Sequence, residues 1–131
     1  MKQEHLTAIF VLAKRMGNLF DEVTEISRQL ADALDRQDEL SMEMILAMRS
    51  EPIEKLLITD EALREHLESI EELGDRERVR ALLNGDGSVS CSDMEAALSQ
   101  QAALNGRLHQ KLLELDKIIS YKIGRDKSIY R

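Results

Sequence analysis

The sequence predicts an all-α fold, an antiparallel bundle of two or three long helices with short helical segments and coiled-coil-like packing. Its first quarter carries apolar residues at alternating steps of three and four, which keeps one seam of a helix against a partner helix. Aromatic residues make up 3% of the 131 residues, and there is no tryptophan; this composition suits aliphatic helix packing better than a β-sandwich. One proline and six glycines leave few helix breaks. The seam consists of Ile9, Leu12, Met16, Leu19, Val23, Ile26, Leu30 and Ala33.

The first helix should extend from about residue 2 to about residue 34, because polar residues crowd together at 35–38. Lys14 and Arg15 interrupt the apolar run near the N-terminus, so we interpret that run as the first turns of the helix and not as a signal peptide. No stretch approaches the roughly 18 apolar residues of a membrane span. We therefore expect no membrane insertion.

A second helix is expected from about residue 38 to about residue 73, with Pro52 as its main irregularity. The proline is compatible with a new helix capped by Ser50, because the first helical turn needs no N–H at that position. It is also compatible with one long, kinked helix, since proline removes a hydrogen bond from a helix interior. We expect a kink or a short break. Gly74 is a natural residue to end this helix.

A short helix is expected at about residues 75–83, with Asp75 as its N-cap. The turn Asn84-Gly85-Asp86-Gly87 should end it. The residues around this turn imitate a calcium loop, but Leu82 falls on the first ligand position, where calcium needs an anionic oxygen. We therefore predict a polar turn and no metal site.

The final helix should extend from about residue 93 to about residue 123. Ser92 and Glu95 are spaced as a capping box at its start. Gly124 is expected to end it and to leave a short C-terminal tail. Residues 1–131 are then expected to form a single helical domain.

The net charge of −7 argues against nucleic-acid binding, because a phosphate backbone needs clustered Lys and Arg. The charge is uneven: residues 51–75 carry nine acids and two bases, a net of −7, whereas residues 117–131 carry five bases and one acid, a net of +4. A solvated face accounts for most such asymmetry. Cys91 is the only cysteine, so no internal disulfide can form, and a reducing cytoplasm is the expected location.

No residue pattern indicates an enzyme. His5, His66 and His109 lie far apart and lack the spacing of a zinc motif. The acids near Glu68 and Glu71 alternate with solvent-facing positions and do not form the isolated carboxylate pair of a hydrolase. Neither a G-x-x-x-x-G-K-[ST] loop nor a G-x-G-x-x-G loop is present. We predict no catalytic residue, no cofactor and no metal.

The candidate binding surface is the apolar side of the final helix, which covers an arc of roughly 140° at about 100° per residue. That arc is wider than a two-helix seam requires. It fits core packing in a three- or four-helix bundle, and it also fits a groove that receives a helix of a partner protein. The side consists of Leu104, Leu108, Leu112, Leu115, Ile118, Ile119 and Ile123.

The order of these elements resembles the FlgN-type flagellar export chaperones. The break at 33–38 is similar to the small and acidic segment before their second helix. Leu104-Asn105, followed by leucines at 108, 112 and 115, is similar to their final helix. The tail from 124 to 131, with Tyr130, also fits. The resemblance is one of pattern and covers most of the chain.

This resemblance implies a cytoplasmic, non-enzymatic chaperone for flagellar type III export. It would bind the C-terminal helical segments of hook–filament junction proteins, prevent their premature assembly and deliver them to the export apparatus. The apolar side of the final helix would hold this client. Tyr121 and Tyr130, in the basic C-terminal end, would contact the export machinery.

Two other interpretations stay open. A self-associating structural coiled coil or helical bundle would fill the same wide seams with its own copies, as a homo-oligomer without an export client. A metal-regulated helical switch would use the loop between Asn84 and Asp93. Measurements of client binding, of oligomeric state and of calcium binding would distinguish these three interpretations.

Overall fold

The computed structural model describes residues 3–129, with side chains described through residue 124. Within that range the chain forms four α-helices, one 3₁₀ turn and no strand, which confirms the all-α prediction. No helix of the described residues is both long and apolar enough to cross a membrane. The elements are α1 (Gln3–Asp35), α2 (Glu39–Glu68), α3 (Leu73–Leu83), the 3₁₀ turn η1 (Gly87–Val89) and α4 (Asp93–Ile129).

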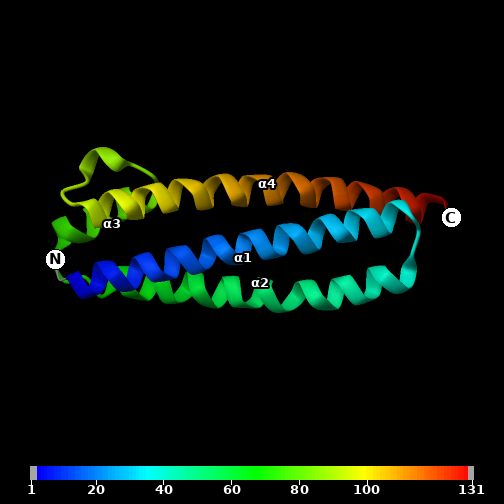
Figure 1. The fold of residues 1–131 in the computed structure, drawn as a ribbon, viewed down its shortest axis with the longest axis horizontal. Coiled ribbons are helices and arrows are strands. Elements are labelled where there is room, and N and C mark those ends of the chain that lie inside the picture. The colour runs from blue at the N-terminus through cyan, green and yellow to red at the C-terminus, as the bar shows by residue number, and fades with distance from the viewer. Residues whose placement is uncertain (1–2, 130–131) are drawn as a thin grey trace.

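The central helix is α1, which has α2 along one side and α4 along the other (Figure 1). Helix α2 runs antiparallel to α1, whereas α4 runs parallel to it; α3 and η1 lie together near the start of α4 (Figure 1). In the described part of the chain, no Cα atom of α2 lies within 8 Å of a Cα atom of α4. The three long helices therefore form an open bundle in which α1 supplies both interfaces.

Two series of buried residues run along α1, because it packs against two helices. The first is the predicted heptad seam, most of which is buried. The second contains small residues that the heptad does not include, and at Gly17 the nearest side chains belong to Gln101 and Asn105 of α4. Small residues allow two helix backbones to approach closely. The second series includes Ala13, Gly17, Thr24, Ser27 and Ala31.

Helix α2 begins at an aspartate cap and passes through Pro52 without a break. The Oδ1 atom of Asp38 accepts a hydrogen bond from the backbone N–H of Ser41 at 3.1 Å. Pro52 is buried inside a continuous helix, so the expected alternative of a short break is wrong. Ser50 does not cap a new helix, because its hydroxyl donates to the carbonyl oxygen of Ala47 at 2.8 Å.

The end of α2 lies earlier than the sequence predicts, at Glu68 instead of Leu73. Leu73 is instead the first residue of α3. The turn between them is stabilised by Arg76, whose guanidinium donates to the carbonyl oxygen of Ile70 at 2.7 and 3.1 Å. Arg76, which follows the turn in the sequence, thus supplies hydrogen bonds to a carbonyl group of the turn. The turn therefore needs neither glycine nor proline.

Helix α3 begins two residues before the predicted start at residue 75. Its N-cap position is Glu72, which makes no side-chain capping hydrogen bond. Gly74 and Asp75 therefore lie in its first turn, where an acidic side chain is favourable near the positive end of the helix dipole. The expected roles of Gly74 as a helix end and of Asp75 as an N-cap are both wrong. The helix ends at Leu83.

Helix α4 begins with Ser92 as its N-cap, which is the serine half of the predicted capping box, and extends past its predicted end. The hydroxyl oxygen of Ser92 accepts a hydrogen bond from the backbone N–H of Glu95 at 3.1 Å. The helix continues through Gly124 to Ile129, so the predicted stop at Gly124 is wrong. Nothing lies within 4 Å of a Cβ placed at Gly124. An exposed glycine in a helix costs about 1 kcal/mol relative to alanine, which is too little to end a helix of this length.

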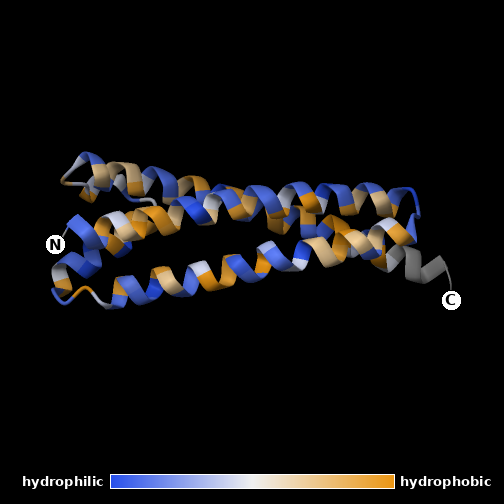
Figure 2. Cartoon of the chain, turned by 60° about the horizontal axis from the view of Figure 1, so that its bottom comes forward, coloured by the Kyte–Doolittle hydropathy of each residue, from blue (hydrophilic) through white to orange (hydrophobic). Residues whose placement is uncertain are grey.

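The core consists of three clusters that follow one another along α1. The cluster nearest the start of α1 receives side chains from all four α-helices, whereas the two others receive them from α1, α2 and α4. Figure 2 shows apolar and polar segments alternating along the long helices, as amphipathic packing requires. The largest fully buried apolar side chains are Ile9, Val23, Leu30, Leu34, Val79, Leu82 and Leu98.

Candidate functional site

The predicted client-binding side of α4 is divided between the core and the surface. Its buried part packs against α1, so these residues are core residues in the free bundle. The remaining residues are partly or largely accessible. The buried members are Leu112 and Ile119, the half-buried members are Leu108, Leu115 and Ile123, and the exposed members are Leu104 and Ile118.

Of the two tyrosines in the basic C-terminal end, the structure describes Tyr121. Tyr121 has 70% of its surface exposed. Tyr130 lies outside the described residues. A nearby ion pair joins α4 to α1: the Nζ atom of Lys122 lies 2.6 Å from Oδ1 of Asp35.

An apolar groove lies between α2 and α4, with α1 as its floor; we call it the α2–α4 groove. Its volume is about 440 Å³. The groove exists because α2 and α4 both pack on α1, while their own backbones stay more than 8 Å apart between Cα atoms in the described residues. The floor is formed by Met16, Phe20 and Val23, and the apolar walls by Ile53, Leu56 and Leu57 of α2 and by Leu112 and Leu113 of α4.

The groove continues toward α3 as a second hollow of about 250 Å³. Both hollows share Met16 and Phe20 as floor residues. Leu83, the last residue of α3, lines the second hollow, together with the small residues Ala102 and Gly106 of α4. Helix α3 therefore closes this end of the groove.

An arginine connects both walls with the floor at the other end. The Nε atom of Arg49 donates to the hydroxyl oxygen of Ser27 at 2.8 Å, and its Nη2 atom lies 2.5 Å from Oδ1 of Asp116. Arg49 belongs to α2, Ser27 to α1 and Asp116 to α4. The ion pair links the two walls of the groove directly.

The remaining polar residues of the groove are paired or stacked. The Nε atom of Arg64 lies 3.1 Å from Oδ2 of Asp60 on the same helix. The ring of His109 stacks on Phe20, with a centroid separation of 5.4 Å. These contacts leave the centre of the groove apolar, which suits an apolar ligand surface better than a charged one.

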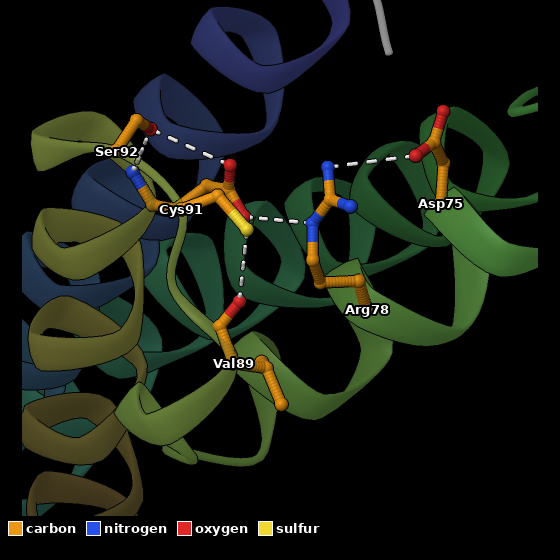
Figure 3. A network of polar contacts seen from close by, with 6 residues as sticks. Asp75, Arg78, Val89, Cys91 and Ser92 are labelled. Carbon is orange, nitrogen blue, oxygen red and sulfur yellow. Dashed lines mark hydrogen bonds and ion pairs between the residues drawn. The ribbon is translucent and has the colours of Figure 1, made fainter.

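A polar network fixes α3 against the beginning of α4 (Figure 3). The guanidinium of Arg78 lies 2.8 Å from Glu95 and 3.4 Å from Asp75. Glu95 is nearly fully buried and also belongs to the capping box with Ser92. Burial lowers the pKa of Arg78, but the hydrogen bond and the charge of Glu95, with smaller contributions from Cys91 and Asp75, outweigh burial and raise that pKa.

The loop that resembles a calcium site is held by its own side chains. The Oδ1 atom of Asp86 accepts hydrogen bonds from the backbone N–H and the hydroxyl of Ser88, at 3.0 and 2.5 Å. Across the described residues, no group of three or more His, Cys, Asp or Glu side chains is placed to hold a metal ion. Cys91 is exposed, and its thiol lies 3.6 Å from the carbonyl oxygen of Val89.

Several groove residues were not identified from the sequence, chiefly Phe20, Arg49, Leu57 and Leu113. Phe20 falls outside the heptad. The sequence around Arg49, Leu57 and Leu113 has the same amphipathic pattern whether or not the helix also borders a groove. The available signal was the second series of small residues along α1. A helix with two buried series packs against two partners, and that arrangement leaves a groove wherever the partners do not meet.

Comparison with known proteins finds no family model, no curated protein and no solved structure that matches this chain. The functional assignment therefore depends on the geometry of the groove and on the sequence pattern.

Proposed function

We propose that this protein binds an amphipathic helix of another polypeptide in the α2–α4 groove. The observation that supports this function best is the open position between α2 and α4 above the apolar floor of α1. A helix presents apolar side chains at i, i+3, i+4 and i+7. Such a stripe, laid on Met16, Phe20 and Val23, would complete a four-helix bundle.

The more specific proposal is a chaperone for flagellar type III export, as the FlgN-type resemblance implies. Its clients would be the C-terminal helical segments of hook–filament junction proteins, which must stay apart until they assemble. Covering an apolar helix in a groove blocks that assembly without catalysis, because the chaperone only needs to bind the free helix. The chaperone would act in the cytoplasm. Exposed Tyr121, which lies beyond the groove on α4, would contact the export machinery.

The test uses two exposed leucines at the rim of the groove. Leu57 and Leu113 are 68% and 43% exposed, respectively, so Leu57→Gln with Leu113→Gln should leave the bundle folded. Loss of their burial in the complex should weaken binding of a junction-protein C-terminal segment by about tenfold or more, measured by titration calorimetry. Leu73→Gln is the matched control, because Leu73 is similarly exposed (65%) and lies outside the groove. Equal loss in both variants, or none in either, contradicts the proposal.

Leu112 and Ile119 are unsuitable for this test. Both pack in the core against α1, so a charged side chain at either position would destabilise the free protein. A loss of client binding would then report unfolding.

Self-association is a second candidate function, because α2 carries a separate apolar stripe. Leu40, Met44 and Met48 repeat at steps of four and are each at least half exposed. Methionine side chains adapt well to a partner surface. A homo-oligomer formed through this stripe should dissociate in Leu40→Gln with Met44→Gln, as measured by sedimentation. It should persist when Leu57 and Leu113 are changed.

A further inference from the structure

Helix α3 occupies the fourth-helix position at one end of the bundle. Its buried residues Val79 and Leu82 belong to the same core cluster as Ile9 of α1, Leu63 of α2 and Leu98 of α4. The bundle therefore has four helices at this end and three beyond it. The α2–α4 groove lies in line with α3.

The C-terminal end of α3 faces the groove. The contacts between α3 and α4 advance along both helices in the same order. Arg78 pairs with Glu95, and Gly85, just after α3, lies against Ala103. The two helices therefore run in the same direction, and Leu83 is the residue that lines the groove.

This end of α3 is a fixed structure. Gly85 has a φ of +85°, and its backbone N–H donates to the carbonyl oxygen of Leu82 at 2.9 Å. The N–H of Asp86 donates to the carbonyl oxygen of Ala81 at 3.0 Å. These two bonds form a Schellman motif. Together with the ion pair between Arg78 and Glu95, they hold the end of α3 in place.

We propose, on the basis of the proposed function, that α3 is a built-in first segment of the fourth helix and that the client helix continues it. The client would begin next to Leu83 and end near the bridge between Arg49 and Asp116. On α1 the floor extends from Ala13 to Val23, which are ten residue steps or about 15 Å apart, and it reaches Ser27 after about 21 Å. The groove therefore admits about 10–14 residues, or about three to four helical turns.

The direction of the client follows from the helix dipole. The C-terminal end of α3 carries partial negative charge, which favours the positive N-terminal end of the next helix. The client helix would therefore lie N-terminus first against α3, parallel to α1 and α4.

Length selectivity is tested with synthetic amphipathic peptides. Each has leucine at i, i+3, i+4 and i+7, has Lys and Glu elsewhere, and is stapled on its polar side so that helicity stays constant. With lengths of about 7, 11, 14 and 21 residues, affinity should rise at least about tenfold up to 14 residues and less than about twofold beyond. A rise that continues to the longest peptide overturns the inference, as does binding independent of length, which a small apolar ligand site would show.

Direction is tested with the peptide of about 14 residues, spin-labelled at one end, and the full-length protein observed by NMR. A label at the N-terminus should broaden the amide signals of Asn84 and Gly85, and a label at the C-terminus should broaden those of Arg49 and Asp116. The Leu57→Gln, Leu113→Gln variant should lose both effects, whereas Leu73→Gln should keep them. The reverse pattern, or equal broadening from both labels, overturns the inference.

The two proposals fail in different ways. If the peptides bind with the expected length and direction but junction-protein segments do not bind, the export function is wrong and this inference stands. If the junction-protein segments bind with their N-terminal end away from α3, this inference is wrong and the export function stands. If no peptide binds, this inference is also wrong.

Discussion

The side-chain amide of Asn105 on α4 donates a hydrogen bond to the backbone carbonyl oxygen of Ala13 on α1, with an Nδ2–O distance of 2.8 Å. Gln101 supports this contact, because its Nε2 atom donates to Oδ1 of Asn105 at 2.9 Å. Gly17 leaves the space that both side chains occupy. The bond fixes the register of α4 on α1, and with it the position of one groove wall over the floor.

Replacement of Gly17 by alanine should test this register contact. The new Cβ would lie 2.7 Å from Nε2 of Gln101 and 2.8 Å from Oδ1 of Asn105, so both side chains must move. Loss of the hydrogen bond to Ala13 should cost about 1 kcal/mol, which offsets the roughly 0.5–1 kcal/mol that alanine contributes in a helix. Urea denaturation should therefore show little net change.

Two further variants separate those opposing effects. In an Asn105→Ala background, Gly17→Ala should stabilise the protein by about 0.5–1 kcal/mol, because the displaced contact is already absent. Gly106→Ala should give a similar gain on its own, since nothing lies within 4 Å of a Cβ at that position. Additive effects of Gly17→Ala and Asn105→Ala would show that the two residues are not coupled.

Removal of the bridge between Arg49 and Asp116 should loosen the groove walls. A double-mutant cycle with Arg49→Met and Asp116→Asn should give a coupling energy of about 0.5–1 kcal/mol, because Asp116 is partly exposed. The coupling should shrink in about 1 M salt. Spin labels on the exposed positions Glu54 and Lys117 should report a longer and broader distance distribution in the variants. Removal of the exposed ion pair of Lys55 should change neither property.

Arg78→Met should destabilise the end of the bundle that α3 closes. The change leaves the carboxylate of Glu95 buried without its cation, which should cost about 1.5–3 kcal/mol in urea denaturation. Hydrogen exchange should increase first in α3, since its attachment to α4 is lost. Arg80→Met is the control on the same helix, because Arg80 makes only exposed ion pairs and should cost less than about 1 kcal/mol.

The cap of α2 should weaken in acid. Hydrogen bonds from the hydroxyl and the backbone N–H of Ser41 lower the pKa of Asp38 below its usual 3.8. A carboxylate with a lowered pKa in the folded state contributes stability that is present above pH 3.8 and is lost as the pH falls through the lower, folded-state pKa. A carboxyl NMR titration should show the lowered pKa, and Ser41→Ala should raise it. Asp38→Asn, which can cap α2 without titrating, should remove this part of the pH dependence.

The helical fold was predictable because the heptad residues of α1 and the capping box of Ser92 and Glu95 are local signals. The boundary between α2 and α3 was not, because no glycine or proline marks the turn before Leu73. That turn depends on Arg76, which satisfies the carbonyl oxygen of Ile70 from the next helix. The end of α4 was predicted wrongly because a glycine is present there, at Gly124. An exposed glycine lowers helix stability without ending the helix.

The candidate site was only partly predictable. The apolar arc of α4 has the same sequence pattern whether α1 or a partner helix covers it, so the pattern cannot separate Leu112, which is buried, from Ile118, which is exposed. Arg49 gave no signal, because its partner Asp116 lies 67 residues away in the chain. Such residues become identifiable only once the order of the helices in space is known.

The central place of α1 determines how much sequence change each helix can tolerate. A substitution in α2 or α4 disturbs one long-helix interface, whereas one at Ser27 or Ala31 of α1 disturbs residues that lie between both neighbours. Larger side chains at these positions would push apart two surfaces at once. Homologous sequences should therefore diverge most slowly along α1, even though the residues that a ligand contacts are shared among three helices.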